Sequence, residues 1–191
     1  TGFKFISDLI EKNDNTSNKQ LLLAFEESHG YLAKPISRDK DAIQMVPLLI
    51  KYKNLLNKNG LTFKDTINDI YQNIGEFKDR TIAPSFEGSK GNEKISKIMS
   101  QFRNKDIDSI CGMDVKQIED YQIGKIRNVK EGTTESLSLP NTNLIRFIFD
   151  KGFIALRPSG TEPKIKLYFS LNVNDIDAIT GQFEKDYINH I

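Results

Sequence analysis

The sequence predicts an α/β part, in which helices accompany a short mixed sheet, followed by an α+β part with an antiparallel sheet and helices on one face. Early in the 191-residue chain, apolar residues recur at helical spacing, at Phe3, Ile6, Leu9 and Ile10. Towards the other end, residues 163–171 alternate apolar and polar side chains, which is typical of a strand with one buried face. Several such strands beside a few helices indicate an α+β arrangement for that half.

The first part contains signals for three helices and one strand. We expect the first helix to reach about residue 11 and a buried strand to cover residues 21–25. Asp39 is placed to cap a long second helix, because a carboxylate before an apolar-periodic run accepts from the free amides of the first turn. Thr62 is placed in the same way to cap a third helix that ends before Gly75.

The domain boundary is expected after residue 76, which gives domains of residues 1–76 and 77–191. Asp150-Lys151-Gly152 separates two apolar runs and predicts a tight hairpin in the second domain. The strands expected in this domain lie near residues 80–86, 120–127, 143–149, 153–157 and 163–171, and its helices cover residues 95–102 and 176–187.

A loop at residues 157–164 carries residue types that bind anions. Arg157 presents a planar fork of donors that matches phosphate oxygens. Ser159 and Thr161 add hydroxyl groups, and Gly160 has no side chain to block a close approach by backbone amides. A Pro-Ser-Gly-Thr string is by itself an ordinary turn, so the loop alone leaves both interpretations open.

A second polar loop follows the expected strand at residues 21–25. Glu26 and Ser28 stand in it, and Gly30 closes it. Carboxylates accept from sugar hydroxyls and serine can donate or accept, so the pair suits a sugar. A solvated turn after a strand explains the same residues equally well.

The two loops together resemble two motifs of the α-D-phosphohexomutases, the phosphoglucomutase/phosphomannomutase family. R-P-S-G-T-E-P-K at residues 157–164 is similar to the phosphate-binding loop of the family's fourth domain. E-E-S-H-G at residues 26–30 is similar to the sugar-recognition loop of its third domain, and the two occur in the family's order. The resemblance implies that the chain is a C-terminal fragment, in which a partial third domain precedes the whole fourth domain.

The same resemblance implies the roles of individual residues. Arg157, Ser159, Gly160 and Thr161 would hold the phosphate that is not reacting, while Glu26 and Ser28 would hold sugar hydroxyls. Additional substrate contacts are expected from residues that match shorter family segments or adjoin the sugar loop, namely Lys4, His29, Arg38 and Lys40.

The activity implied by the resemblance is the interconversion of hexose 1-phosphate and hexose 6-phosphate. It runs through a phosphoserine enzyme and a hexose 1,6-bisphosphate, with Mg²⁺ at the transferring phosphoryl group. Neither a serine loop nor a metal loop of the family's kind is found in these 191 residues. We therefore expect no catalytic residue and no metal site here, and a fragment that is inactive by itself. An amino-sugar phosphate mutase of the same superfamily, a non-catalytic sugar-phosphate-binding module and a plain interaction domain remain as alternatives.

Composition limits the partners. A net charge of +1 provides no general field for nucleic acid. No apolar run approaches the roughly 20 residues needed to span a bilayer, so neither nucleic acid nor a membrane is an expected partner. The expected partners are a hexose phosphate, the N-terminal domains of the same protein and, because truncation would expose apolar surface, a second copy of the fragment. The single cysteine, Cys111, excludes an internal disulfide and favours a cytoplasmic location.

Overall fold

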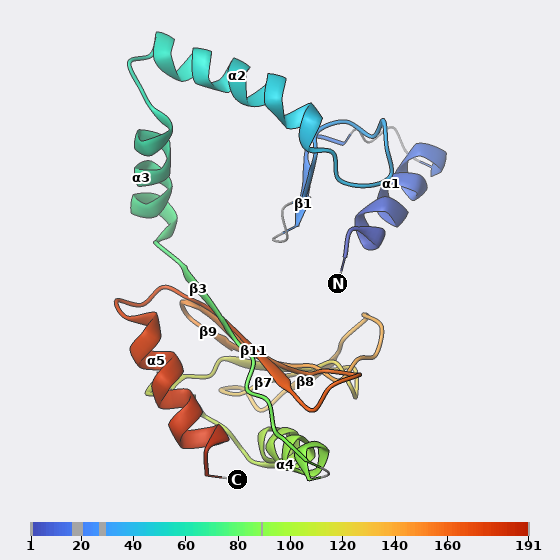
Figure 1. The fold of residues 1–191 in the computed structure, drawn as a ribbon, viewed down its shortest axis with the longest axis vertical. Coiled ribbons are helices and arrows are strands. Elements are labelled where there is room, and N and C mark those ends of the chain that lie inside the picture. Colours follow the sequence, from blue (N-terminus) through green and yellow to red (C-terminus); the bar gives the residue numbers. More distant parts are fainter. Residues whose placement is uncertain (1, 17–20, 27–29, 89, 191) are drawn as a thin grey trace. The chain divides into compact units, whose positions relative to one another are not determined.

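The computed structural model describes residues 2–16, 21–26, 30–88 and 90–190. The chain divides into two compact units, Thr1–Tyr71 and Gln72–Ile191. Within the described ranges, no helix has the length and apolar character needed to cross a membrane. Figure 1 shows the helices of the first unit and the large sheet of the second.

The first unit consists of helices around a small hairpin, which agrees with the expected class. The two strands pair antiparallel, with Glu26 opposite Gly30, so the described sheet is not mixed. The elements are α1 (Lys4–Thr16), β1 (Ala24–Glu26), β2 (Gly30–Leu32), α2 (Ala42–Lys58) and α3 (Phe63–Ile74), and α3 crosses into the second unit.

Side-chain caps mark the starts of α2 and α3, and the cap of α2 is not the residue that the sequence predicts. Asp41, not Asp39, is the N-cap of α2, and its carboxylate accepts from the Ile43 amide at 2.9 Å. Asp39 instead accepts from the amide of its neighbour Lys40 at 2.8 Å. At α3, the Thr62 hydroxyl accepts from the Asp65 amide at 3.2 Å while the Asp65 carboxylate accepts from the Thr62 amide at 2.7 Å, which is a reciprocal capping arrangement.

The core of the first unit is small. It consists of Phe3, Ile10, Ala24 and Leu32, with Ile6 and Leu21 packed against them. The strand expected at residues 21–25 starts later and is only partly buried, because the side chain of Phe25 is 65% exposed.

The second unit is built on a seven-stranded sheet. All of its paired neighbours run antiparallel, in the order β3-β11-β10-β9-β6-β7-β8. Its strands are β3 (Lys78–Ile82), β6 (Gln117–Asp120), β7 (Lys125–Asn128), β8 (Thr134–Ser136), β9 (Ile145–Phe149), β10 (Gly152–Pro158) and β11 (Ile165–Leu171). A separate pair is formed by β4 (Ser109–Ile110) and β5 (Met113–Asp114).

Helices cover one face of this sheet. They are α4 (Gly91–Asn104) and α5 (Ile176–Phe183), and α5 continues as a π-helical turn, η1 (Glu184–Ile188). Both lie on the same side of the sheet in Figure 1. Alternate residues of each central strand meet them in one core, in which Phe102 of α4 and Phe183 of α5 stack with ring centroids 5.6 Å apart. This arrangement confirms the α+β class for the second half.

One expected strand is two strands. The sequence predicts a single strand near residues 120–127, but β6 and β7 form a hairpin that turns between Asp120 and Lys125. The polar segment after it contains β8, which pairs with β7 through Ile126 and Glu135. The alternation along these short strands is weak, since Asp120 and Asn128 stand at positions where it calls for an apolar residue.

Candidate functional site

The loop at residues 159–164 connects two long central strands. β10 and β11 pair along their whole length, from Gly152 opposite Leu171 to Pro158 opposite Ile165. The Ser159 amide donates to the Lys164 carbonyl at 2.9 Å and closes the loop at its base. The four residues between Ser159 and Lys164 therefore extend from the end of a rigid pair of strands, which suits a site that must hold a ligand still.

The hydroxyl of Ser159 has a role that the sequence did not indicate. Its oxygen accepts long bonds from the amides of Thr161, at 3.4 Å, and Glu162, at 3.3 Å. The hydroxyl thus organises the turn, and its own proton stays available for a ligand oxygen because an acceptor hydroxyl retains its donor.

Gly160 and Thr161 lie at the exposed tip of the loop. A Cβ built on Gly160 meets no other atom within 4 Å, and the backbone there is not in the left-handed region. Neither packing nor backbone strain within the chain requires glycine at this position. The open space in front of it is compatible with an approaching anion.

An ion pair stiffens the far side of the loop. The Lys164 ammonium contacts the Glu162 carboxylate, and the Lys164 amide donates to the Glu162 carbonyl at 2.7 Å. The hydrogen bond and charge of Lys164 hold the pKa of Glu162 below its ordinary value. Because Glu162 is partly neutralised by this contact, it opposes an anion at the loop less than a free carboxylate would.

The segment at residues 84–86, which follows β3, holds the end of the loop around Pro163 by two backbone hydrogen bonds, and we call this contact the clamp. The Phe86 amide donates to the Pro163 carbonyl at 2.9 Å, and the Ile165 amide donates to the Pro84 carbonyl at 3.2 Å. Gly91, the first residue of α4, lies against this segment, since a Cβ built there would fall 2.4 Å from the Phe86 carbonyl oxygen. The loop is therefore joined through its Pro163 arm to the start of α4.

Arg157 precedes the loop on β10, directly opposite Lys166 of β11. Its side chain makes no hydrogen bond, ion pair or ring contact with any residue that the structure describes. By contrast, Arg103, Arg127 and Arg146 on the same unit each pair with a carboxylate at 2.6–3.2 Å. A half-buried, unpaired guanidinium beside a lysine leaves positive charge available at the base of the loop.

The second candidate loop lies in the first unit. Glu26 ends β1 and forms an ion pair with Lys40, which lies fourteen positions along the chain. Gly30, opposite Glu26 in the hairpin, makes room for this pair, because a Cβ built there would fall 2.5 Å from Cδ of Lys40 and 2.9 Å from Cγ of Glu26. The structure thus brings together two predicted site residues that are distant in sequence.

Two predicted contacts make other interactions in the structure. Arg38 donates from Nη2 to Asp14 at 2.7 Å and from Nε to Glu11 at 3.2 Å, and the hydrogen bond that it donates to Asp14 raises the pKa of Arg38. These bonds fasten the segment before α2 to α1. Lys4 lies over the ring of Phe5 at 5.1 Å, on the exposed side of α1. Ser28 and His29 lie outside the described residues.

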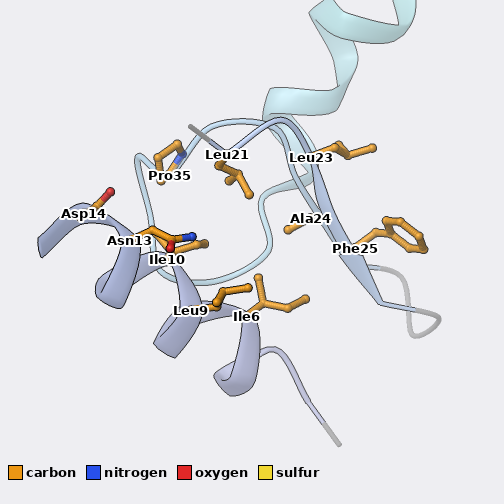
Figure 2. Close-up of a pocket in the computed structure, with 10 residues that line it drawn as sticks. All are labelled: Ile6, Leu9, Ile10, Asn13, Asp14, Leu21, Leu23, Ala24, Phe25 and Pro35. Atoms are coloured by element: carbon orange, nitrogen blue, oxygen red, sulfur yellow. The ribbon is translucent and has the colours of Figure 1, made fainter. Parts of the chain in front are cut away.

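The apolar pocket of the first unit has a different character. It has a volume of about 290 Å³ between α1 and the hairpin, and Figure 2 shows Ile6, Leu9 and Phe25 around it. Asn13 and Asp14 are its polar side chains, and neither belongs to the predicted sugar or phosphate residues. This pocket offers a sugar phosphate few hydrogen-bonding groups.

The described residues contain no group of three or more His, Cys, Asp or Glu side chains arranged to hold a metal ion. Magnesium prefers several carboxylate or carbonyl oxygens, so these residues do not fit it.

The comparisons with known proteins agree with the resemblance of the two loops. Residues 112–170, which include the whole loop at 157–164, match the family model described as phosphoglucomutase/phosphomannomutase, C-terminal domain. A phosphoglucomutase from Staphylococcus saprophyticus is 73% identical over 191 residues, which are 100% of this chain and 35% of that protein. The chain belongs to the phosphoglucomutase/phosphomannomutase family.

Further relatives of the family support the same assignment. A phosphoglucomutase from Staphylococcus aureus is 48% identical over 179 residues, or 94% of this chain and 32% of that protein. The chain thus spans about a third of the length of the curated relatives it matches. The open form of the exocytosis-sensitive phosphoprotein parafusin, a phosphoglucomutase from Paramecium, shares the fold, with a TM-score of 0.59, 20% identity, and coverage of 97% of this chain and 31% of that one.

Proposed function

We propose that this chain is the sugar- and phosphate-binding portion of a phosphohexomutase that interconverts hexose 1-phosphate and hexose 6-phosphate. The observation that carries the proposal is the unpaired guanidinium of Arg157 at the base of the loop whose tip, Gly160 and Thr161, is open to ligand. Arg157, Ser159, Gly160 and Thr161 would hold the phosphoryl group that is not reacting. The names of the staphylococcal relatives favour the glucose branch over the amino-sugar branch.

The rest of the reaction is assigned to residues outside these 191. The proposed cycle needs a phosphoserine, a hexose 1,6-bisphosphate intermediate and Mg²⁺, which supplies charge stabilisation at the transferring phosphoryl group. No described cluster fits the metal, so its ligands are proposed to come from other parts of the protein. The chain alone would then bind the sugar phosphate without turning it over. A cytoplasmic location is part of the proposal and is supported by the free thiol of Cys111.

Glu26 is proposed to accept from sugar hydroxyls. Its side chain is 14% exposed and its carboxylate is oriented by Lys40, so little conformational freedom remains to be lost on binding. Ser28 is proposed as its companion, with Lys4, His29, Arg38 and Lys40 as additional contacts. Among the described members of that group, Arg38 bonds to Glu11 and Asp14 of α1. Its main role would therefore be to hold the segment before α2 in place.

Titration of the chain with glucose 1-phosphate, followed by the NMR shifts of its amides, tests the proposal. The largest shifts are expected at residues 157–161. Replacing the planar fork by an ammonium in Arg157→Lys should weaken binding by about 1–3 kcal/mol, the range for a charged hydrogen bond. Arg127→Lys is the matched control, because Arg127 of β7 pairs with Asp106 at 2.6 Å. This substitution should leave the dissociation constant for glucose 1-phosphate unchanged.

The outcomes separate the alternatives. An unchanged dissociation constant in Arg157→Lys would remove Arg157 from the site. Turnover of the bound sugar phosphate by the isolated chain would contradict the proposal that the catalytic residues lie outside these 191. The absence of any shift at millimolar glucose 1-phosphate, both here and in the longer protein, would favour a plain interaction domain.

A further inference from the structure

One face of the seven-stranded sheet is not covered by the helices of its own unit. α4 and α5 pack on the face that carries Phe147, Leu156 and Leu167. Side chains alternate between faces along a strand, so Arg157 lies on the opposite face together with Arg146 and Tyr168. This face, which we call the open face, has no described helix of the second unit over it.

Arg146 lies on the open face between Glu119 of β6 and Ala155 of β10. Its Nη1 donates to the Glu119 carboxylate at 3.2 Å, and its guanidinium lies 4.4 Å from the centroid of the Phe153 ring. Glu119 also accepts from the Tyr121 hydroxyl at 2.9 Å. The Phe153 ring and the Glu119 carboxylate therefore hold the side chain of Arg146 in one orientation.

This network leaves part of Arg146 without a protein partner. Its Nε is buried and has no hydrogen-bond partner, and its side chain as a whole remains 35% exposed. A guanidinium has five donors, so the contacts of Arg146 with Glu119 and Tyr121 do not use all of them. An arginine whose orientation is fixed and whose donors are incompletely used is suited to binding a ligand.

The register places Arg146 next to the phosphate loop. Arg146 lies opposite Ala155, and Arg157 is two positions further along the same strand on the same face. Diagonal neighbours of this kind are about 7–8 Å apart in an antiparallel pair. A group attached to a phosphate held at residues 157–161 can therefore extend along the open face to Arg146.

We propose that Arg146 is a sugar-contacting residue of the site, which donates to ring hydroxyls of a hexose phosphate whose phosphoryl group is held at residues 157–161. This inference rests on the proposed function, because it requires the phosphate to occupy that loop. Hydroxyls are favoured over a second phosphate because Glu119 offsets the charge of Arg146, which weakens its attraction for another anion without removing its donors.

The test compares two ligands on the same chain, glucose 1-phosphate and inorganic phosphate. The chain without substitutions should bind glucose 1-phosphate more tightly than inorganic phosphate. Arg146→Met keeps the unbranched stem over Phe153 but removes every donor, so it should weaken glucose 1-phosphate binding about tenfold, as loss of a charged hydrogen bond does. Binding of inorganic phosphate should stay the same.

Tyr121→Phe is the matched control, because it removes a bond to Glu119 from the same network but leaves the donors of Arg146 in place. It should retain the preference for the sugar phosphate. Where Arg146→Met does not fold, Arg146→Lys keeps a cation beside Glu119 and loses the planar fork, and it should still reduce the preference.

The failures are distinguishable. Equal loss of both ligands in Arg146→Met, or a full preference retained in both Arg146 variants, overturns the inference while residues 157–161 still bind phosphate. A chain that binds inorganic phosphate and glucose 1-phosphate equally also overturns it, since no sugar contact then exists. A chain that binds neither ligand overturns the proposed function and this inference together.

Discussion

No contact with the described residues explains why position 160 is a glycine. A Cβ at this position meets no protein atom within 4 Å, so Gly160→Ala should fold with no loss of stability and a gain of up to about 1 kcal/mol from a less flexible unfolded state. The added methyl stands where a phosphate oxygen would approach the loop amides. Phosphate binding should therefore weaken at least tenfold, or about 1.4 kcal/mol.

Thermal unfolding and a phosphate titration of the same sample measure both effects. Gly181→Ala is the matched control, because Gly181 of α5 also has open space at its Cβ position and lies away from the loop. A Gly160→Ala variant that binds phosphate as tightly as the Gly181→Ala variant would show that no ligand approaches Gly160.

The pKa of Glu162 reports on the order of the loop. Its hydrogen bond and ion pair with Lys164 lower the pKa in the folded chain, so this carboxylate contributes stability above its unfolded pKa of 4.5 and loses the contribution as the pH falls through the folded value. An NMR titration of the Glu162 carboxyl carbon should give a midpoint below 4.5. In Lys164→Met the midpoint should rise towards 4.5, and an unchanged midpoint would mean that the pair does not form in solution.

At the scale of elements, we expect the conformation of the loop at residues 157–164 to depend on the contact between α4 and the segment at residues 84–86. Gly91→Ala would bring a methyl 2.4 Å from the Phe86 carbonyl oxygen and 3.1 Å from Cβ of Pro163, and both are parts of the clamp. Forcing these groups apart should destabilise the chain by about 1–3 kcal/mol, as overpacking does.

The same change should also weaken phosphate binding, because Pro163 belongs to the loop. Denaturant unfolding combined with the titration described for Gly160 measures the two effects. Loss of stability with normal phosphate affinity would show that the loop keeps its conformation without the clamp.

The long elements were predictable because their patterns are local. β11 carries alternating apolar and polar residues. Asp150-Lys151-Gly152 separates the apolar runs of β9 and β10, and the structure confirms the hairpin that this pattern predicts. The β6–β7 hairpin was missed because strands of four residues carry too few alternations to separate them from one longer strand. Two carboxylates near the start of α2 compete for its cap, and Asp41 is nearer to the helical residues than Asp39.

The candidate site was predictable only where it is contiguous in sequence. Residues 157–161 lie in one loop because two paired strands hold its ends. The ion pair of Glu26 with Lys40 depends on a tertiary contact over fourteen positions, and no periodicity reports it. The acceptor role of the Ser159 hydroxyl and the network around Arg146 likewise depend on geometry across the turn and the strands.

At the scale of the whole molecule, the two units differ in how well they bury apolar residues. The second unit joins both of its longer helices and all its central strands in one core. In the first, Leu56 is the one buried residue among those described in α2, and α3 has none. Large apolar side chains stand exposed on these two helices, among them Ile43, Val46, Leu49, Ile50, Leu55, Ile67, Ile70 and Ile74.

We therefore expect residues 1–71 to exchange their amide hydrogens faster than residues 72–191 when the chain is monomeric. Local stability follows buried apolar contacts, and hairpin β1–β2 with its four-residue core has few. Hydrogen exchange measured at low and high protein concentration checks this, with size-exclusion chromatography to report the association state. Protection of α2 and α3 that rises with concentration would indicate that a second copy covers their apolar residues, whereas uniform protection in a monomer would contradict the difference in stability between the units.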